Sequence, residues 1–176
     1  MIFAKTKFAS LFILTPFIII LDQWTKYLVL ERFRLGESVP VIDGFFSLTY
    51  IRNPGAAFGL FAQAHPGFRI PFFIIVPAVA LVVISFIFKK IPPKDIKLSA
   101  ALSLVIGGAV GNLIDRMRFN YVVDFLDFYW RNYHFPAFNV ADSAICVGVG
   151  LLMLDLLFCE NKETTKDSQV NASSVN

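Results

Sequence analysis

Long runs of apolar residues recur along the chain and predict where it crosses a membrane. Ile70–Phe88 has no charged residue over 19 positions, and Leu98–Ile114 has none over 17 positions. A helix needs about 20 mostly apolar residues to span a bilayer. Two further apolar runs, near the two ends of the chain, reach that length only if charged residues are included. We therefore predict a mainly α membrane protein with four transmembrane helices, over about residues 8–30, 70–88, 98–115 and 137–159.

The segment between the first two predicted spans, residues 31–69, is too long to be a simple connection. Asp43-Gly44 is typical of a turn, and Phe46, Leu48 and Tyr50 then alternate with small polar residues. An apolar residue at every second position indicates a strand with one buried face. We predict a small β platform with interfacial loops that lies on the membrane surface. The alternative is an irregular interfacial loop.

The composition supports a membrane protein. Hydrophobic residues make up 56% of the chain and charged residues 16%, whereas soluble domains carry about 25% charge. The net charge of +3 is small and scattered, which argues against nucleic acid as a partner. Lys5 and Lys7 precede the first apolar run, but no small-residue cleavage site follows, so we expect this run to remain as an anchor. We predict one membrane domain over residues 1–160 and a disordered polar tail over residues 161–176.

The basic residues predict the orientation of the spans. The connection between the second and third spans holds four lysines within nine residues, namely Lys89, Lys90, Lys94 and Lys97. Short, densely basic connections stay on the cytoplasmic side of a membrane. Both termini are therefore expected in the cytoplasm, and the segment 31–69 on the outer side. Tyr and Trp residues gather in or beside the outer segments, as expected of side chains that favour the membrane–water interface.

Two aspartates, Asp124 and Asp142, lie in sequence expected at or inside the membrane. A carboxylate near hydrocarbon is costly, so it is interpreted as functional by default. The two residues are 18 positions apart and would lie about 27 Å from each other on one continuous helix. The segment 127–136 between them can turn the chain back as a loop. We therefore expect the two carboxylates on separate segments at the outer face of the membrane.

Further polar residues converge on the outer ends of the first and third spans. Asp22 and Lys26 are spaced i, i+4, which favours a structural ion pair within one helix. Asn112, Asp115 and Arg116 follow a glycine-rich stretch and share one helix face. Their side chains would bind a peptide backbone or order the two aspartates. The alternative is an Asp–Arg cap at the end of the helix.

The chemistry open to these residues is that of carboxylates. The sequence has no metal-ligand spacing and no nucleotide-binding loop, and we expect neither a metal nor a cofactor. His65 and His134 are isolated in predicted loops and are expected to be solvated. Two carboxylates that share a proton can activate water and polarise a peptide carbonyl, as in an aspartic endopeptidase. The alternative is a non-catalytic lipid- or peptide-binding membrane protein, or a small proton-coupled carrier, although carriers usually have repeats and more spans.

Five short segments carry most of the polar residues in a fixed order. They are Asp22-Gln23-Trp24-Thr25-Lys26, Asn53-Pro54-Gly55-Ala56-Ala57-Phe58, Gly107 to Arg116, Val122-Val123-Asp124-Phe125 and Phe138-Asn139-Val140-Ala141-Asp142-Ser143. Together with the layout of four spans, they resemble the lipoprotein signal peptidase family, also called signal peptidase II. The resemblance covers about residues 10–158, and no motif position departs from the family pattern.

The resemblance implies an aspartyl endopeptidase of the bacterial inner membrane whose active site lies near the periplasmic face. The implied substrate is a prolipoprotein, cleaved just before a cysteine that carries diacylglyceryl. By motif position, Asp124 and Asp142 correspond to the catalytic pair. The positions implied to contact the substrate or the pair are Asn53, Asn112, Asp115, Arg116 and Asn139. Among these, Asp115 is expected to order Arg116. Asp22 and Lys26 match a motif with a structural role. We expect a monomer that contacts membrane phospholipid and the substrate.

Overall fold

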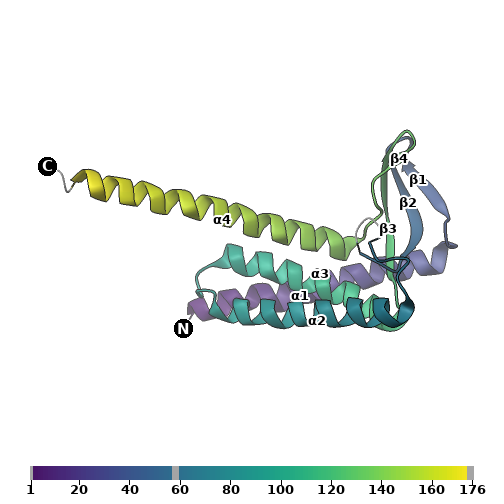
Figure 1. Cartoon of the computed structure of the whole chain (residues 1–176), viewed down its shortest axis with the longest axis horizontal. Helices are drawn as coiled ribbons and strands as arrows, with labels where there is room; N and C mark the ends of the chain where they lie inside the picture. Colours follow the sequence, from purple (N-terminus) through teal and green to yellow (C-terminus); the bar gives the residue numbers. More distant parts are fainter. Residues whose placement is uncertain (1, 57–59, 174–176) are drawn as a thin grey trace.

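The fold is built from long helices that carry a small sheet across one end (Figure 1). The computed structural model describes residues 2–56 and 60–173, with side chains described over residues 7–56 and 60–158. Within that part of the chain the helices are α1 (Ile2–Arg32), α2 (Pro66–Lys90), α3 (Ile96–Phe119) and α4 (Val140–Ser173). Each contains a stretch long and apolar enough to cross a membrane, so the prediction of four spans is confirmed.

The ends of the helices differ in detail from the predicted spans. α1, α2 and α3 extend beyond the predicted bounds, while α4 begins at Val140 rather than at residue 137. α4 continues as a helix through Ser173, past residue 159. The disorder expected for residues 161–176 stays a prediction, and residues 174–176 lie outside the described residues. The start of α1 and the far end of α4 lie at the same end of the molecule, opposite the sheet (Figure 1).

The sheet is antiparallel, with the strand order β1-β2-β3-β4. Its strands are β1 (Ser38–Ile42), β2 (Phe46–Asn53), β3 (Val122–Trp130) and β4 (Tyr133–His134). Gly44 adopts a φ of 76° between β1 and β2, a left-handed conformation that glycine adopts without steric cost. The predicted β platform and its turn are therefore confirmed, and the alternative of an irregular loop is wrong.

β3 was not predicted from the sequence, which placed residues 127–136 in a returning loop. The structure instead puts the first of these residues at the end of β3 and turns the chain back through a tight connection into β4. Val123 and Phe125 of β3 are buried with Tyr50 of β2 and Val29 of α1 in one apolar cluster. This cluster seats the sheet on the end of α1 and fixes the position of Asp124 between its buried neighbours.

Glycines let α1 and α4 approach α3 closely. A methyl group added at Gly111 would lie 2.6 Å from Oδ2 of Asp22, and one added at Gly108 would collide with the backbone oxygen of Ala141. Small residues allow such close helix packing in membranes, as the glycine-rich stretch suggested. α3 is consequently the most buried of the candidate spans. The polar ends of α1, α3 and α4 are thereby brought together under the sheet.

Candidate active site

Asp124 and Asp142 reach one site from two separate elements. Asp124 lies on β3 and is 1% exposed, whereas Asp142 lies in the first turn of α4. Asn139 connects them, because its Nδ2 donates to Oδ1 of Asp124 at 2.7 Å and its Oδ1 accepts from the backbone N–H of Asp142 at 2.9 Å. The second bond is the usual contact of a helix N-cap residue. The expected convergence of the two aspartates from separate segments is therefore present in the fold.

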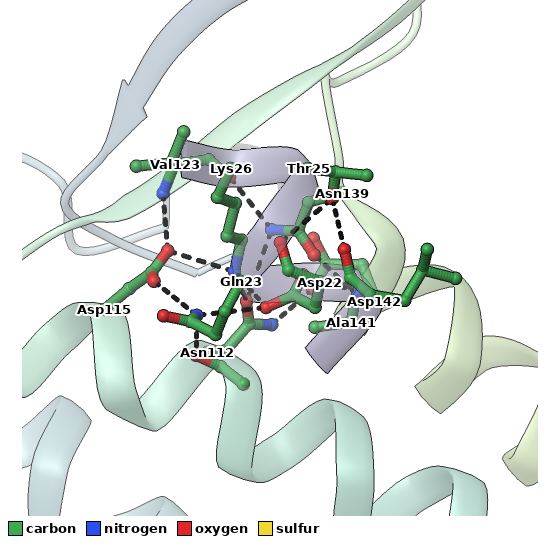
Figure 2. Close-up of polar contacts among 12 residues, drawn as sticks. Asp22, Gln23, Thr25, Lys26, Asn112, Asp115, Val123, Asn139, Ala141 and Asp142 are labelled. Carbon is green, nitrogen blue, oxygen red and sulfur yellow. Dashed lines mark hydrogen bonds and ion pairs between the residues drawn. The ribbon is translucent and has the colours of Figure 1, made fainter. Parts of the chain in front are cut away.

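Asn112 of α3 supports Asp142 from the other side. Its Nδ2 donates to Oδ1 of Asp142 at 2.7 Å, and its Oδ1 accepts from Nζ of Lys26 at 3.0 Å (Figure 2). Nδ2 of Asn139 also donates to Oδ1 of Asn112, at 3.2 Å. An ammonium group only donates hydrogen bonds, so Oδ1 of Asn112 must face Lys26. The amide therefore presents its N–H group to Asp142.

Lys26 joins two buried carboxylates from different helices. Its Nζ lies 2.9 Å from Asp22 of α1 and 3.0 Å from Asp115 of α3, and all three side chains are at most 2% exposed. The i, i+4 ion pair predicted within α1 is thus present, but it is only half of the arrangement. Asp22 also accepts from the backbone N–H of Ala141 at 2.9 Å, and Asp115 from that of Val123 at 3.0 Å. The cluster therefore links α1, α3, β3 and α4 at the base of the site.

Gln23 is a member of this cluster that the sequence did not single out. Its Nε2 lies 2.9 Å from Oδ1 of Asp115, 3.2 Å from Oδ2 of Asp22 and 3.2 Å from the backbone oxygen of Gly111 (Figure 2). An amide that donates to two carboxylates offsets part of their mutual repulsion. Its position directly after Asp22 was the one signal in the sequence that Gln23 could belong to the cluster. Helix spacing alone gives no reason to expect its contact with α3.

Arg116 points away from its neighbour Asp115. Its Nη2 donates to the backbone oxygen of Gly55 at 3.2 Å, and its guanidinium carbon lies 5.1 Å from the centre of the Phe73 ring. Successive residues on a helix point about 100° apart, and Asp115 is already paired with Lys26. Among the contacts of the described residues, Asp115 therefore does not order Arg116, and neither that expectation nor the Asp–Arg cap is correct.

Asn53, the last residue of β2, holds the other oxygen of Asp124. Its Nδ2 donates to Oδ2 of Asp124 at 3.0 Å, while its Oδ1 accepts from the backbone N–H of Gly55 at 3.0 Å. Asp124 thus accepts one amide hydrogen bond on each carboxyl oxygen, from Asn53 and Asn139. The predicted site residues Asn53 and Asn139 are both in direct contact with this aspartate.

A cavity of about 1050 Å³ opens beside both aspartates, between the sheet and the ends of α3 and α4. Asn53, Asn112 and Arg116 line it together with the two aspartates. Burial, and after it the negative charge of Asp142, raise the pKa of Asp124 to about 7, although the hydrogen bonds from Asn53 and Asn139 act to lower it. Asp124 can therefore hold a proton near neutral pH, as the acid in carboxylate-catalysed hydrolysis must.

The donor groups around the cavity suit carboxylate chemistry. Over the described residues, no group of three His, Cys, Asp or Glu side chains is placed to hold a metal ion. The hydroxyl of Ser143, next to Asp142, donates to the backbone oxygen of Asn139 at 2.9 Å. Asp142 itself lies at the N-terminal end of α4, where the helix dipole favours a negative charge.

Comparison with known proteins assigns the chain to a family. A sequence model of signal peptidase (SPase) II matches residues 14–158. The chain belongs to the signal peptidase II family. It is 50% identical over 148 residues to the lipoprotein signal peptidase of Syntrophotalea carbinolica, over 84% of this chain and 91% of the relative. It is 53% identical over 145 residues to that of Geobacter sulfurreducens, over 82% of this chain and 89% of the relative.

Solved structures agree with the signal peptidase II assignment. A bacterial membrane enzyme determined by the in meso method at 2.3 Å resolution has a TM-score of 0.77 and 36% identity, over 85% of this chain and 88% of that chain. A second, at 1.9 Å, has a TM-score of 0.75 and 32% identity, over 85% and 93%. The chain is accordingly a multi-pass bacterial membrane protease. The alternative of a non-catalytic binding protein or proton-coupled carrier is not favoured.

Proposed function

We propose that this signal peptidase II removes the signal peptide from lipid-modified prolipoproteins and that Asp124 and Asp142 are its catalytic pair. Cleavage falls just before the cysteine that carries diacylglyceryl. The observation that carries the proposal is the meeting of both carboxylates in one cavity, bridged by Asn139. The relatives are lipoprotein signal peptidases by name, which supports the substrate class.

Asp142 acts as the base and Asp124 as the acid in the first step. The raised pKa of Asp124 keeps a proton on it near neutral pH, whereas Asp142 lies in the first turn of α4, where the helix dipole favours its ionised form. Asp142 takes a proton from water as the water oxygen bonds to the carbonyl carbon. Asp124 gives its proton to the carbonyl oxygen. The product is a neutral tetrahedral intermediate, and no charge accumulates on the substrate.

The second step breaks the C–N bond. Asp142 passes its proton to the leaving nitrogen, while Asp124 takes back a proton from one hydroxyl of the intermediate. The signal peptide leaves with a new carboxyl group and the lipidated cysteine with a free amino group. Both aspartates return to their starting protonation states, so the cycle consumes only water and the peptide bond.

The remaining polar residues hold the substrate and the pair in place. Asn53 and Asn139 fix the two oxygens of Asp124, and Asn112 fixes Asp142. Arg116 lines the cavity with donors suited to backbone carbonyl oxygens of the substrate. These assignments divide the site into groups that react and groups that orient them.

The membrane setting follows from where the cavity lies. Ile145 and Cys146, one turn beyond Asp142 on α4, line its apolar part, where the acyl chains of a modified cysteine can remain in lipid. With the lysine-rich connection between α2 and α3 in the cytoplasm, both termini lie there and the site lies near the periplasmic face. We propose that the enzyme acts as a monomer, because one chain supplies both aspartates and the amides around them.

The test is cleavage of a synthetic prolipoprotein peptide in two forms, with and without diacylglyceryl on its cysteine. Mass spectrometry should find a signal peptide that ends in a free carboxyl group and a lipidated peptide that begins with cysteine. The unmodified peptide should be cleaved far more slowly. Cleavage at another bond, or equal rates for the two peptides, would contradict the proposal.

A further inference from the structure

A second acid–base pair, Asp127 and His134, lines the same cavity as the catalytic aspartates. Nδ1 of His134 lies 2.9 Å from Oδ1 of Asp127, which is 5% exposed. Thr49 donates to the other oxygen of Asp127 at 3.0 Å. The imidazole ring stacks on the ring of Tyr129, with 4.9 Å between the centres and 17° between the planes. These two contacts therefore hold the histidine in one orientation.

The pairing determines which nitrogen of His134 is available to a ligand. An ionised carboxylate only accepts hydrogen bonds, so Nδ1 carries the proton that faces Asp127. In the neutral imidazole, Nε2 is then left with a lone pair that can accept from an N–H group. The side chain of His134 is 55% exposed, so a ligand in the cavity can reach it. A backbone N–H of a peptide is a suitable partner for such a nitrogen.

The two ends of the cavity are chemically different. One end is formed by α3 and α4 within the candidate membrane spans, and the other by the sheet, beyond those spans. Asp127 follows Asp124 by three positions along β3, a distance of about 10 Å at 3.3 Å per residue. Asp127 and its partner His134 therefore mark the sheet end of the cavity, with Asp127 about three extended residues from Asp124 along β3.

The substrate has a matching asymmetry. A signal peptide is apolar and stays in the membrane, whereas the polypeptide after the cysteine is released to the aqueous side. The membrane end of the cavity therefore suits the signal peptide, and the sheet end suits the chain that follows the cut. We propose that Asp127 and His134 form a binding subsite for that following chain, with Nε2 of His134 accepting a backbone N–H about two to three residues beyond the cysteine. This inference rests on the proposed function.

Two lipidated substrates with the same signal sequence test the subsite. The long one continues for about six residues after the modified cysteine, and the short one ends directly after it, so that only the long one reaches His134. The readout is the ratio of kcat/KM for the long substrate to that for the short one. His134→Ala should lower this ratio about three- to ten-fold, mainly through KM, as expected for the loss of one hydrogen bond.

Two further variants separate the hydrogen bond from other effects. His134→Phe keeps a ring to stack on Tyr129 but has no ring nitrogen, so it should lower the ratio as much as His134→Ala. His65 is the N-cap residue of α2 and does not line the cavity. His65→Ala should therefore leave the ratio unchanged. The subsite would be overturned if both His134 variants left the ratio unchanged, including the case in which kcat/KM falls equally for the long and the short substrate. Absence of cleavage of either substrate by the unaltered enzyme would instead refute the proposed function.

Discussion

Nζ of Lys26 donates to Oδ1 of Asn112 at 3.0 Å, and this bond determines which end of the amide faces Asp142. Lys26 on α1 therefore determines, through Asn112 on α3, which hydrogen bond the proposed catalytic residue Asp142 on α4 receives. Lys26 does not line the cavity, so it acts on the chemistry only through Asn112 and the fold. The structural role expected for Lys26 and Asp22 therefore extends to the orientation of the site.

Replacing Lys26 with methionine should destabilise the protein strongly. The variant keeps the length of the side chain but leaves Asp22 and Asp115 buried without their ammonium partner. Removing one partner from a buried ion pair costs about 3–5 kcal/mol. The check is the thermal unfolding temperature in detergent, with Lys90→Met, an exposed lysine at the end of α2, as the matched control. Equal unfolding temperatures for the two variants would show that the cluster contributes little.

The pH dependence of cleavage should follow the proton on Asp124. Its pKa is raised to about 7, so above that pH Asp124 loses its proton and the acid of the first step is lost. We expect kcat/KM to fall about ten-fold per pH unit on the alkaline side. Rates for the lipidated substrate measured from about pH 5 to about pH 9 provide the check. A rate that keeps rising through this range would assign the acid to another group.

The same proton should affect stability. The pKa of Asp124 is higher in the folded protein than the ordinary value of 3.8, so its contribution to folding is fully present below about pH 4 and is lost as the pH rises through about 7. Asp124→Asn has no proton to lose and should show a smaller loss of stability over this range. Unfolding temperatures of both proteins at a series of pH values measure the difference. Parallel curves would contradict the raised pKa.

Gly111→Ala should damage both stability and activity. The added methyl group would lie 2.6 Å from Oδ2 of Asp22, in the ion-pair cluster below the site. Overpacking of this kind costs about 1–3 kcal/mol. Gly150→Ala is the control, because a methyl group there meets nothing within 4 Å. Unfolding temperature and cleavage rate should both fall in the first variant and hold in the second. Similar behaviour of the two would mean that α1 can move away from α3.

The sequence predicted those features that depend on local pattern. The spans follow from uninterrupted apolar stretches such as Ile70–Phe88, because a bilayer imposes a minimum length on each helix. The turn at Asp43-Gly44 follows from the backbone freedom of glycine. The polar residues of α1 and α3 were predicted at the same membrane face, because successive spans alternate in direction and these residues lie at the outer ends of the first and third spans.

Features that depend on contacts between distant segments were missed. β3 is buried on both faces at residues 122–125, so the apolar–polar alternation that marks a surface strand is absent. The ion-pair partner of Asp115 is Lys26 on another helix, whereas the family resemblance had been taken to imply that Asp115 orders Arg116. His134 was interpreted as isolated because its partner Asp127 becomes adjacent only when β3 and β4 pair, whereas its expected exposure to solvent is present.

The most direct test of the central claim is the cleavage rate of the lipidated substrate by Asp124→Asn and by Asp142→Asn. Each variant keeps the size of the side chain but removes a carboxyl group that the proposed reaction needs. Each should lose essentially all activity, at least about a thousand-fold, while its unfolding temperature in detergent shows that it remains folded. Cleavage by either folded variant at a rate close to that of the unaltered enzyme would contradict the two-aspartate mechanism.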